Sequence, residues 1–402
     1  MKRIYLDYAA TTPVDAGVAR AMAKTPFGNP GSLHSFGQEA IAAVDASRET
    51  IARTIGAEFR EIIFTSSATE ANNLALRGAV ARWRLEKHGK LEKHSAQTPR
   101  IIISAIEHES VLETARELER DGVEVISIPV DQHGIVDLAH IKKSLNENTV
   151  LVSIMYANNE IGAIQPIAEI AKTIRVFTPH ALFHIDAVQA FQFLNCDVRE
   201  LGVDMMTLSS HKIYGPKGAA ALYVRNADNR RVASSLRPLI FGGGQEFGMR
   251  SGTENVPAIV GFAKAVEITE TVRTKESKRI AILRDQLWRG IKKICPEAEL
   301  NGAAKTTAAA TAMLPNILNI YFPGHAAQDL LTRFDLAGLA VSSGSACRSR
   351  AFESSYVIEA LGYSKERAKS SIRFSLGRPT TKAEIAVTLV IVQLFFKKAR
   401  TI

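Results

Sequence analysis

Residues 100–130 read RIIISAIEHESVLETARELERDGVEVISIPV, and they place one amphipathic segment between two short apolar runs. The runs at 100–104 and 123–130 have the length and apolar content of strands. Between them, one helical face is formed by Val111, Leu112, Ala115 and Leu118. Gly122 then supplies a stop signal for the helix. We therefore predict a strand–helix–strand unit.

The same alternation extends in both directions through the first 260 residues. A helix is predicted over 68–83, and further strand-like runs occupy 61–65, 150–156, 181–186 and 205–210. Most of these runs do not alternate strictly between apolar and polar residues, which indicates strands buried on both faces. The predicted fold class is therefore α/β, with a parallel sheet covered by helices.

The pattern changes near residue 260. We predict a long charged helix over about 257–293, followed by an Ala/Thr-rich stretch at 302–313 that is typical of a mobile loop. Beyond it, helices alternate with apolar runs at 317–322, 339–347 and 371–377. This part is predicted to form a second, smaller domain of α+β type.

The composition is that of a globular protein. Of the 402 residues, 46% are apolar, which excludes disorder as the dominant state and is consistent with about two or three domains. The best candidate for a membrane span, 386–396, has about half of the length that a bilayer requires. Asp7 interrupts the N-terminus before the apolar core of a secretory signal. Three widely spaced cysteines argue against a disulfide framework and a zinc cluster, so a cytoplasmic location is expected.

The net charge of +9 does not by itself predict nucleic-acid binding. Part of the basic excess lies in 82–100, a segment without a continuous apolar face. Such a segment is typical of a solvated helix end and loop. Because no homeodomain, zinc-finger or RNA-recognition pattern accompanies it, direct binding of nucleic acid is not expected.

Polar side chains follow several predicted strands, at the edge where an open α/β sheet binds ligands. They are Ser66 to Thr69, His108, Asn159, Asp186 with Gln189, and Ser209 with His211 and Lys212. Hydroxyl and N–H groups at the start of a helix suit a phosphate. A carboxylate that keeps a ring nitrogen protonated, together with a Schiff-base lysine, suits pyridoxal phosphate. Taken singly, Asp186 and His108 are also consistent with helix caps, and Lys212 with a solvated side chain.

Short motifs recur along the whole chain in a fixed order. They are DYAATTP (7–13), GNPGSLH (28–34), TSSATEANN (65–73), ANNEIG (157–162), HIDAVQ (184–189), SSHKIYGPKG (209–218), MRSGTEN (249–255), VSSGSACRS (341–349) and SSIRFSLG (370–377). Together they resemble the motifs of cysteine desulfurases of the NifS/IscS type, in the class V aminotransferase group of fold-type I pyridoxal-phosphate enzymes. The resemblance implies a large cofactor-binding domain at 15–256, with a mostly parallel seven-stranded sheet. It implies a smaller domain, formed by 1–14 and 257–402, that carries a cysteine loop at about 338–354.

The resemblance also implies roles for individual residues. Lys212 forms the Schiff base and moves the Cα proton, Asp186 pairs with the ring nitrogen, and His108 stacks on the ring and assists proton transfer. Further cofactor contacts are implied for Ala68, Thr69, Asn159, Gln189, Ser209 and His211. Thr253 reaches the phosphate of the neighbouring subunit in a homodimer. Arg373 binds the substrate carboxylate, Asn159 lies beside the ring and that carboxylate, and no metal ligand is expected.

Cys347 distinguishes between the reactions that pyridoxal phosphate permits. It lies among small polar residues at 342–349, which are poorly suited to core packing, whereas Cys196 and Cys295 are expected to be structural. The resemblance implies that the Cys347 thiolate attacks the sulfur of L-cysteine, releases L-alanine and holds the sulfur as a persulfide. An acceptor protein, such as an iron–sulfur scaffold or a tRNA thiolation protein, then takes the sulfur.

Two features depart from the family pattern. Arg348 and Arg350 follow Cys347 where small residues are usual, and we expect both cations to lower the pKa of the thiol and to attract an acidic acceptor. The chain ends at residue 402, before the longer tail with which housekeeping members dock the iron–sulfur scaffold, so the acceptor stays open. Two alternatives to a cysteine desulfurase also stay open: a selenocysteine lyase or other class V enzyme, and a non-catalytic scaffold.

Overall fold

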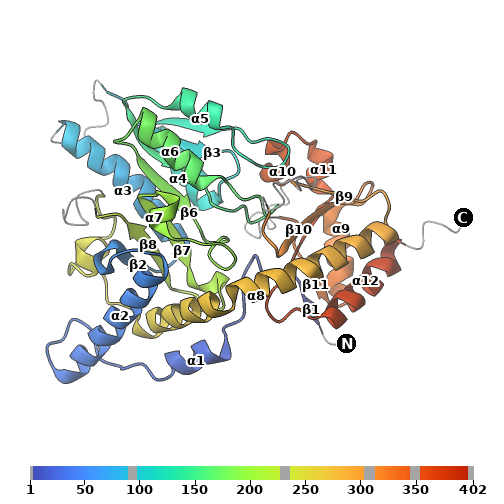
Figure 1. Ribbon diagram of the computed structural model, residues 1–402, viewed down its shortest axis with the longest axis horizontal. Helices are drawn as coiled ribbons and strands as arrows, with labels where there is room; N and C mark the ends of the chain where they lie inside the picture. Colours follow the sequence, from blue (N-terminus) through green and yellow to red (C-terminus); the bar gives the residue numbers. More distant parts are fainter. Residues whose placement is uncertain (1–2, 89–96, 227–235, 303–312, 345–353, 397–402) are drawn as a thin grey trace, which may run out of the picture.

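The computed structural model describes residues 3–88, 97–226, 236–302, 313–344 and 354–396, and a seven-stranded sheet forms its centre (Figure 1). The strand order is β2-β8-β7-β6-β5-β3-β4. The strands are β2 (Ile62–Thr65), β3 (Arg100–Ser104), β4 (Glu124–Ile128), β5 (Thr149–Ser153), β6 (Leu182–Asp186), β7 (Met205–Ser209) and β8 (Ala220–Val224). All neighbours from β7 to β4 are parallel, whereas β8 is antiparallel to both β7 and β2. The prediction of a mostly parallel sheet of seven strands is confirmed.

The sheet is buried on both faces because neighbouring residues of one strand enter two different cores. Ile62 packs in one core with Ile102, and Ile63 packs in the other with Ile101. The first core also contains side chains of α2 (Ser35–Thr54), α5 (Leu138–Ser144), α6 (Ile167–Phe177) and α7 (Val198–Leu201). The second contains side chains of α3 (Ala68–His88) and α4 (Glu109–Arg120). Continuous apolar runs are therefore required in these strands.

A smaller group of strands lies toward the C-terminal end of the chain. One sheet has the order β12-β10-β9, and β1 pairs with β11. The bounds are β1 (Ile4–Tyr5), β9 (Glu299–Leu300), β10 (Ile317–Tyr321), β11 (Leu339–Ala340) and β12 (Ser371–Ser375). The helices that accompany them are α9 (Ala327–Leu336), α10 (Tyr356–Ala360), α11 (Lys365–Lys369) and α12 (Lys382–Phe396). The first strand of the chain thus lies among its last elements.

The long helix α8 (Val256–Ile294) joins the two groups of strands. It contacts α1 (Ala16–Met22) and α2 at one end and α12 and β10 at the other, and Figure 1 shows it crossing the molecule. Asn255 caps its first turn by accepting a hydrogen bond from the backbone N–H of Ala258 (3.2 Å). The predicted helix over about 257–293 is confirmed almost to the residue.

Other predicted elements differ from the structure in instructive ways. The first strand of the chain, α1, α2 and β8 were not assigned from sequence. The buried face of α2 includes Gly37, Ala40 and Ala52, so its apolar face has little contrast with the exposed one. Residues 154–156 of one strand-like run continue past the end of β5 as a loop.

Some predicted features lie outside the described residues. These are the Ala/Thr-rich stretch at 303–312, positions 89–96 of the basic segment, and Cys347 with both following arginines at 345–353. Within the described ranges, no helix combines the length and the apolar character needed to cross a bilayer.

Candidate active site

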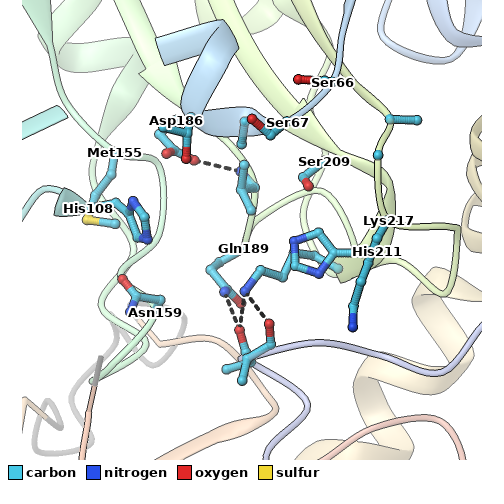
Figure 2. A pocket seen from close by; sticks show the side chains of 18 of the residues that line it. Ser66, Ser67, His108, Met155, Asn159, Asp186, Gln189, Ser209, His211 and Lys217 are labelled. Carbon is cyan, nitrogen blue, oxygen red and sulfur yellow. Dashed lines mark hydrogen bonds between the residues drawn. The ribbon is translucent and has the colours of Figure 1, made fainter. Parts of the chain in front are cut away.

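A pocket of about 360 Å³ opens where β6 and β7 end and α3 begins. This volume is in the range of small-molecule sites. Every predicted site residue except Thr253 and Cys347 lines the pocket, namely Ala68, Thr69, His108, Asn159, Asp186, Gln189, Ser209, His211, Lys212 and Arg373. Figure 2 shows the labelled members of this set arranged around one space, with Lys217, Met155, Ser66 and Ser67 beside them.

The start of α3 forms one wall of the pocket. The hydroxyl of Ser67 accepts a hydrogen bond from Glu70 N (3.1 Å), and the Ser67 carbonyl accepts one from Ala71 N (3.1 Å). The two preceding N–H groups, of Ala68 and Thr69, lie at the pocket wall. Because the first N–H groups of a helix have no partner within it and carry its positive dipole end, this wall suits an anion.

Two cationic side chains and a neutral imidazole border the same region. Burial lowers the pKa of His211 to about 4, and the nearby charges of Lys212 and Lys217 lower it further. His211 is therefore neutral near pH 7, and its Nδ1 lies 3.1 Å from the hydroxyl oxygen of Thr11. Lys217 also lines the pocket, and Figure 2 shows it beside His211.

Asp186 is the last residue of β6 and is buried. Its Oδ1 accepts a hydrogen bond from Val188 N (3.0 Å) in the turn that follows β6, and no helix begins there for Asp186 to cap. Its Oδ2 accepts a hydrogen bond from Asn72 Nδ2 (2.9 Å). An ionised carboxylate has about four acceptor positions, so these bonds orient Asp186 and leave capacity for a donor in the pocket.

His108 caps α4 and faces the pocket at the same time. Its Nδ1 accepts a hydrogen bond from Ser110 N (3.1 Å), which leaves the proton of the neutral ring on Nε2. Burial lowers its pKa, Lys212 lowers it further, and Asp186 opposes both effects. Asn72 Nδ2 donates to Ser110 Oγ (2.8 Å) as well as to Asp186, and Ser110 Oγ lies 2.9 Å from His108 Nδ1. Asn72 therefore links the carboxylate to the imidazole.

Lys212 closes the pocket on the side of the N-terminal segment. Its Nζ donates hydrogen bonds to the carbonyl oxygens of Ala9 (2.6 Å) and Ala10 (2.8 Å). Gln189 Nε2 donates to the same Ala9 carbonyl (3.0 Å). The backbone of one short segment thus fixes both side chains.

Arg373 lies on β12 and is 1% exposed. Its Nη1 donates to the carbonyl oxygen of Asn159 (2.9 Å), and its Nη2 donates to Asp7 Oδ1 (2.7 Å). Its Nε is buried and has no hydrogen-bond partner among the described residues. A planar guanidinium in this state is a ready partner for a carboxylate.

The remaining two predicted residues lie elsewhere. Thr253 lines a second pocket of about 180 Å³, which shares Ser66 and Gly218 with the first. Cys347 lies outside the described residues, but the chain on either side of 345–353 is placed. Ser342 exchanges two backbone hydrogen bonds with Arg373 (3.1 and 2.6 Å), and Ser355 Oγ donates to Glu160 Oε2 (2.5 Å).

Glu107, directly before His108, is fully buried and was not singled out from sequence. Its Oε1 accepts hydrogen bonds from Ser104 Oγ (2.5 Å) and Met155 N (2.7 Å). Burial raises its pKa from 4.5 to about 8, although these two hydrogen bonds oppose the shift. The side chain is therefore mostly protonated at pH 7, and it ties two pocket residues, His108 and Met155, to β3.

This protonation predicts a pH-dependent stability. The folded state holds the Glu107 proton up to about pH 8, whereas the unfolded chain releases it near pH 4.5. The stabilisation that this proton provides is complete below about pH 4.5. It decreases as the pH rises from about 4.5 to about 8, with a slope of at most about 1.4 kcal/mol per pH unit, and is lost above that range. Glu107→Gln does not titrate, and its amide oxygen accepts the same bonds. Thermal unfolding at pH 5 to 9 should therefore show this variant gaining stability relative to wild type as pH rises; parallel profiles would contradict the assignment.

A comparison with family models decides the family. The model described as aminotransferase class-V matches residues 4–387. The chain belongs to this family. Among the curated class-V proteins, a cysteine desulfurase IscS of Dictyoglomus turgidum is 43% identical over 100% of this chain and 97% of its own length. A cysteine desulfurase IscS of Pectobacterium atrosepticum is 46% identical over 97% of this chain and 92% of its own length.

Solved structures show the same class-V fold. A NifS-like protein superposes with a TM-score of 0.87 at 34% identity, covering 98% of this chain and all of its own. A protein named SspA, solved in complex with cysteine, superposes with a TM-score of 0.75 at 36% identity, covering 92% of this chain and 98% of its own. The fold-type I architecture implied by the motifs is confirmed.

Class-V enzymes of this kind use pyridoxal phosphate, and the pocket fits that cofactor. The N-terminus of α3 offers an anion site, and Lys217 adds a positive charge to the same pocket. Asp186 offers a buried acceptor for a protonated ring nitrogen, and Lys212 offers an amine. The neutral imidazole of His108 gives one side of the pocket a flat surface that does not repel a protonated ring.

Sequence reasoning overlooked several residues of this class-V pocket. Ala9 and Ala10 line the pocket and lie within the motif DYAATTP, and Asn72, which orients Asp186 from outside the pocket, lies within TSSATEANN, but the contacts of these residues depend on the fold. The motif SSHKIYGPKG contains Lys217 as well as Lys212, but the sequence alone predicts no role for Lys217. Met155 lies within an ordinary apolar run, and no sequence signal distinguishes it.

Proposed function

We propose that the chain is a cysteine desulfurase, which converts L-cysteine to L-alanine and transfers the sulfur to Cys347 as a persulfide. The observation that carries this conclusion is the pocket itself. It combines Lys212, Asp186 and His108 with Arg373 in a chain that is 43–46% identical to curated cysteine desulfurases over nearly its full length. An amino acid with a thiol side chain is the substrate that this set and Cys347 together require.

The cofactor would be held at three places. Ala68 and Thr69, with Ser209 and His211, would bind the phosphate at the start of α3. Asp186 would accept the ring N–H, and Gln189 would donate to the phenolic oxygen. Pyridoxal phosphate, when bound, supplies an electron sink that stabilises negative charge at the substrate Cα.

The chain's own residues handle the substrate. Arg373 binds the substrate carboxylate through the donors that Asp7 and Asn159 leave available. The Lys212 amine takes the proton from Cα and holds it for return to carbon as alanine forms. His108, whose lowered pKa keeps it neutral, holds a proton on Nε2 beside the reacting atoms.

Cys347 completes the reaction as a nucleophile. Its thiolate attacks the substrate sulfur, so the S–S bond forms as the C–S bond breaks, and the electron pair of that bond remains on carbon until protonation gives alanine. The placed flanks support this role, because Ser342 pairs with Arg373 and Ser355 contacts Glu160, the neighbour of Asn159. The two arginines that follow Cys347 favour the thiolate.

The finer assignments are also proposals. We assign the cofactor-binding domain to 15–256 and the smaller domain to 1–14 and 257–402, because the seven-stranded sheet and the smaller sheets divide the chain near these positions. We place the protein in the cytoplasm, where a persulfide carrier stays reducible. An acceptor protein of iron–sulfur assembly or tRNA thiolation would take the sulfur.

The decisive experiment is incubation of the purified protein with L-cysteine and a thiol reductant, with alanine and sulfide measured together. We expect equal yields of both, and loss of both in Cys347→Ser. Cys196→Ser is the matched control, because Cys196 is buried and lies outside the pocket. If alanine formed without Cys347-dependent sulfide, or if selenocysteine but not cysteine were turned over, the chain would have another class-V activity and would not be a cysteine desulfurase.

The proposed role of Thr253 depends on formation of a homodimer, and it can be tested with mixed dimers. Thr253 lies outside the first pocket of its own chain, so we assign it to the phosphate of the partner subunit. Thr253→Ala should weaken cofactor binding about tenfold or more, the usual cost of losing a hydrogen bond to a charged group. Co-expressed Thr253→Ala and Lys212→Ala chains should regain about half of the wild-type activity per mixed dimer, because one of its sites is then intact. An inactive mixed dimer would place Thr253 in its own chain's site.

A further inference from the structure

One short segment, residues 7–12, touches both ends of the space in which a substrate amino acid would lie. At its start, Asp7 Oδ1 accepts a hydrogen bond from Arg373 Nη2 (2.7 Å). Two residues later, the carbonyls of Ala9 and Ala10 accept hydrogen bonds from Lys212 Nζ (2.6 and 2.8 Å). The segment therefore connects the arginine and the lysine physically.

The segment is fixed at both of its ends. Tyr8 N donates to the carbonyl oxygen of Ser375 (3.2 Å), and Ala9 N donates to Ser375 Oγ (2.9 Å), which holds the start of the segment to β12. Thr12 N and Thr12 Oγ1 both donate to the carbonyl of His211 (3.0 and 2.9 Å), which holds its end to the turn that carries Lys212.

The Asp7–Arg373 contact is the part of this segment that bears on substrate choice. The Arg373 side chain is 2% exposed and the Asp7 side chain 18%. Two of the five guanidinium N–H donors are engaged by Asp7 and by the Asn159 carbonyl, so the guanidinium plane is fixed while other donors remain. A carboxylate recognised by two N–H groups needs that plane to be fixed, because bidentate geometry tolerates little rotation.

We propose that Asp7 is a positioning residue that makes the pocket specific for substrates with a carboxylate, by holding Arg373 at a set distance from Lys212. The inference rests on the proposed function only for the role of Arg373 as the carboxylate-binding group. Asp7 does not touch the substrate; it acts through Arg373, and it leaves the chemistry at sulfur unchanged.

The test compares two amines that differ only in the carboxylate. L-Cysteine and cysteamine, which lacks the carboxylate, are titrated into the cofactor-loaded protein, and the absorbance change of the bound cofactor gives the half-saturating concentration of each. Alanine formation from L-cysteine gives KM and kcat in parallel. The variants are Asp7→Ala, which removes the acceptor, and Asp7→Asn, which keeps an oxygen acceptor at the same place.

For Asp7→Ala we expect the half-saturating L-cysteine concentration and KM to rise at least tenfold, with kcat reduced by less than threefold. Cysteamine should change by less than twofold, because it does not use Arg373. Asp7→Asn should stay within threefold of wild type for L-cysteine. Asp15→Ala is the matched control, since it removes a neighbouring Asp–Arg contact, Arg378 to Asp15 at 3.7 Å, that lies outside the pocket.

Two results would overturn the proposal. One is an unchanged L-cysteine response in Asp7→Ala that still unfolds at the wild-type temperature. The other is an equal shift for L-cysteine and cysteamine in Asp7→Ala or in Asp7→Asn, which would indicate a general structural effect. Failure of the proposed function is distinct, because wild-type protein would then form no alanine.

Discussion

Lys212→Ala is expected to lower alanine formation from L-cysteine by at least about a thousandfold. The substitution removes both the covalent attachment of the cofactor and the proton transfer at Cα. Lys212 lies in the turn after β7, and its Nζ is held by the carbonyls of Ala9 and Ala10. No other described lysine has this position, since Lys217 lies farther along the same loop and is exposed. The measurement is alanine formed per active site at saturating L-cysteine.

Two further variants make this result interpretable. Lys212→Arg keeps the positive charge but cannot form the Schiff base, so it should be as inactive as the alanine variant. Lys264→Ala removes a surface lysine on α8 that pairs with Glu267 (3.0 Å), and it should keep wild-type activity. Activity of Lys212→Ala above about 1% of wild type would mean that another amine does this work.

Asp186→Ala is expected to lower kcat by about a hundredfold or more, the range observed when a preorganised electrostatic group is removed from an active site. The carboxylate is buried at the end of β6 and is oriented by Val188 N and Asn72 Nδ2. Asp186→Asn should be comparably impaired, because it loses the charge and can turn an amide N–H toward the N–H of Asn72. The absorbance of the bound cofactor should change in both variants, since a ring nitrogen without an anionic partner loses its proton more readily.

Asp137 offers a matched control for this change. It is the N-cap residue of α5, and its Oδ1 accepts a hydrogen bond from Ala139 N (2.9 Å), two residues ahead as for Asp186 and Val188, but it lies outside the pocket. Asp137→Ala should therefore cost some stability, about 1 kcal/mol, without lowering kcat. If Asp186→Asn kept more than a tenth of wild-type kcat, the carboxylate would only stabilise the turn after β6 and would not be an electrostatic partner.

The sequence was sufficient for the parts of the fold with strong local signals. The unit at 100–130 was predicted correctly because both strands are rich in Ile and Val and Gly122 follows the helix with a positive φ. The antiparallel strand β8 was not predicted, since AALYV contains small residues and its direction depends on pairing with both β7 and β2. Local periodicity contains no information about strand direction.

The candidate site divides in the same way. Residues at strand ends, such as Asp186 and Lys212, could be found because parallel strands bring their carboxyl ends to one edge. Contacts made by the backbone, such as the carbonyls of Ala9 and Ala10, could not be found, because no side chain identifies them. The raised pKa of Glu107 was also hidden, because a glutamate beside a histidine gives no sign in sequence of being buried.

The pairing of the first residues with the last strands sets the order in which a newly made chain can mature. Ala9 N bonds to Ser375 Oγ across a separation of 366 residues, so the pocket cannot close until nearly the whole chain has left the ribosome. At roughly 5–20 residues per second, the N-terminal segment waits about 20–75 s for its partner strand. During that interval the seven-stranded sheet, complete by residue 224, has time to form. We therefore expect cofactor capture to be late, and a truncated chain that lacks β12 would lose the contacts of Tyr8 and Ala9 with Ser375 and keep the bonds of Thr12 to His211 and the pairing of β1 with β11.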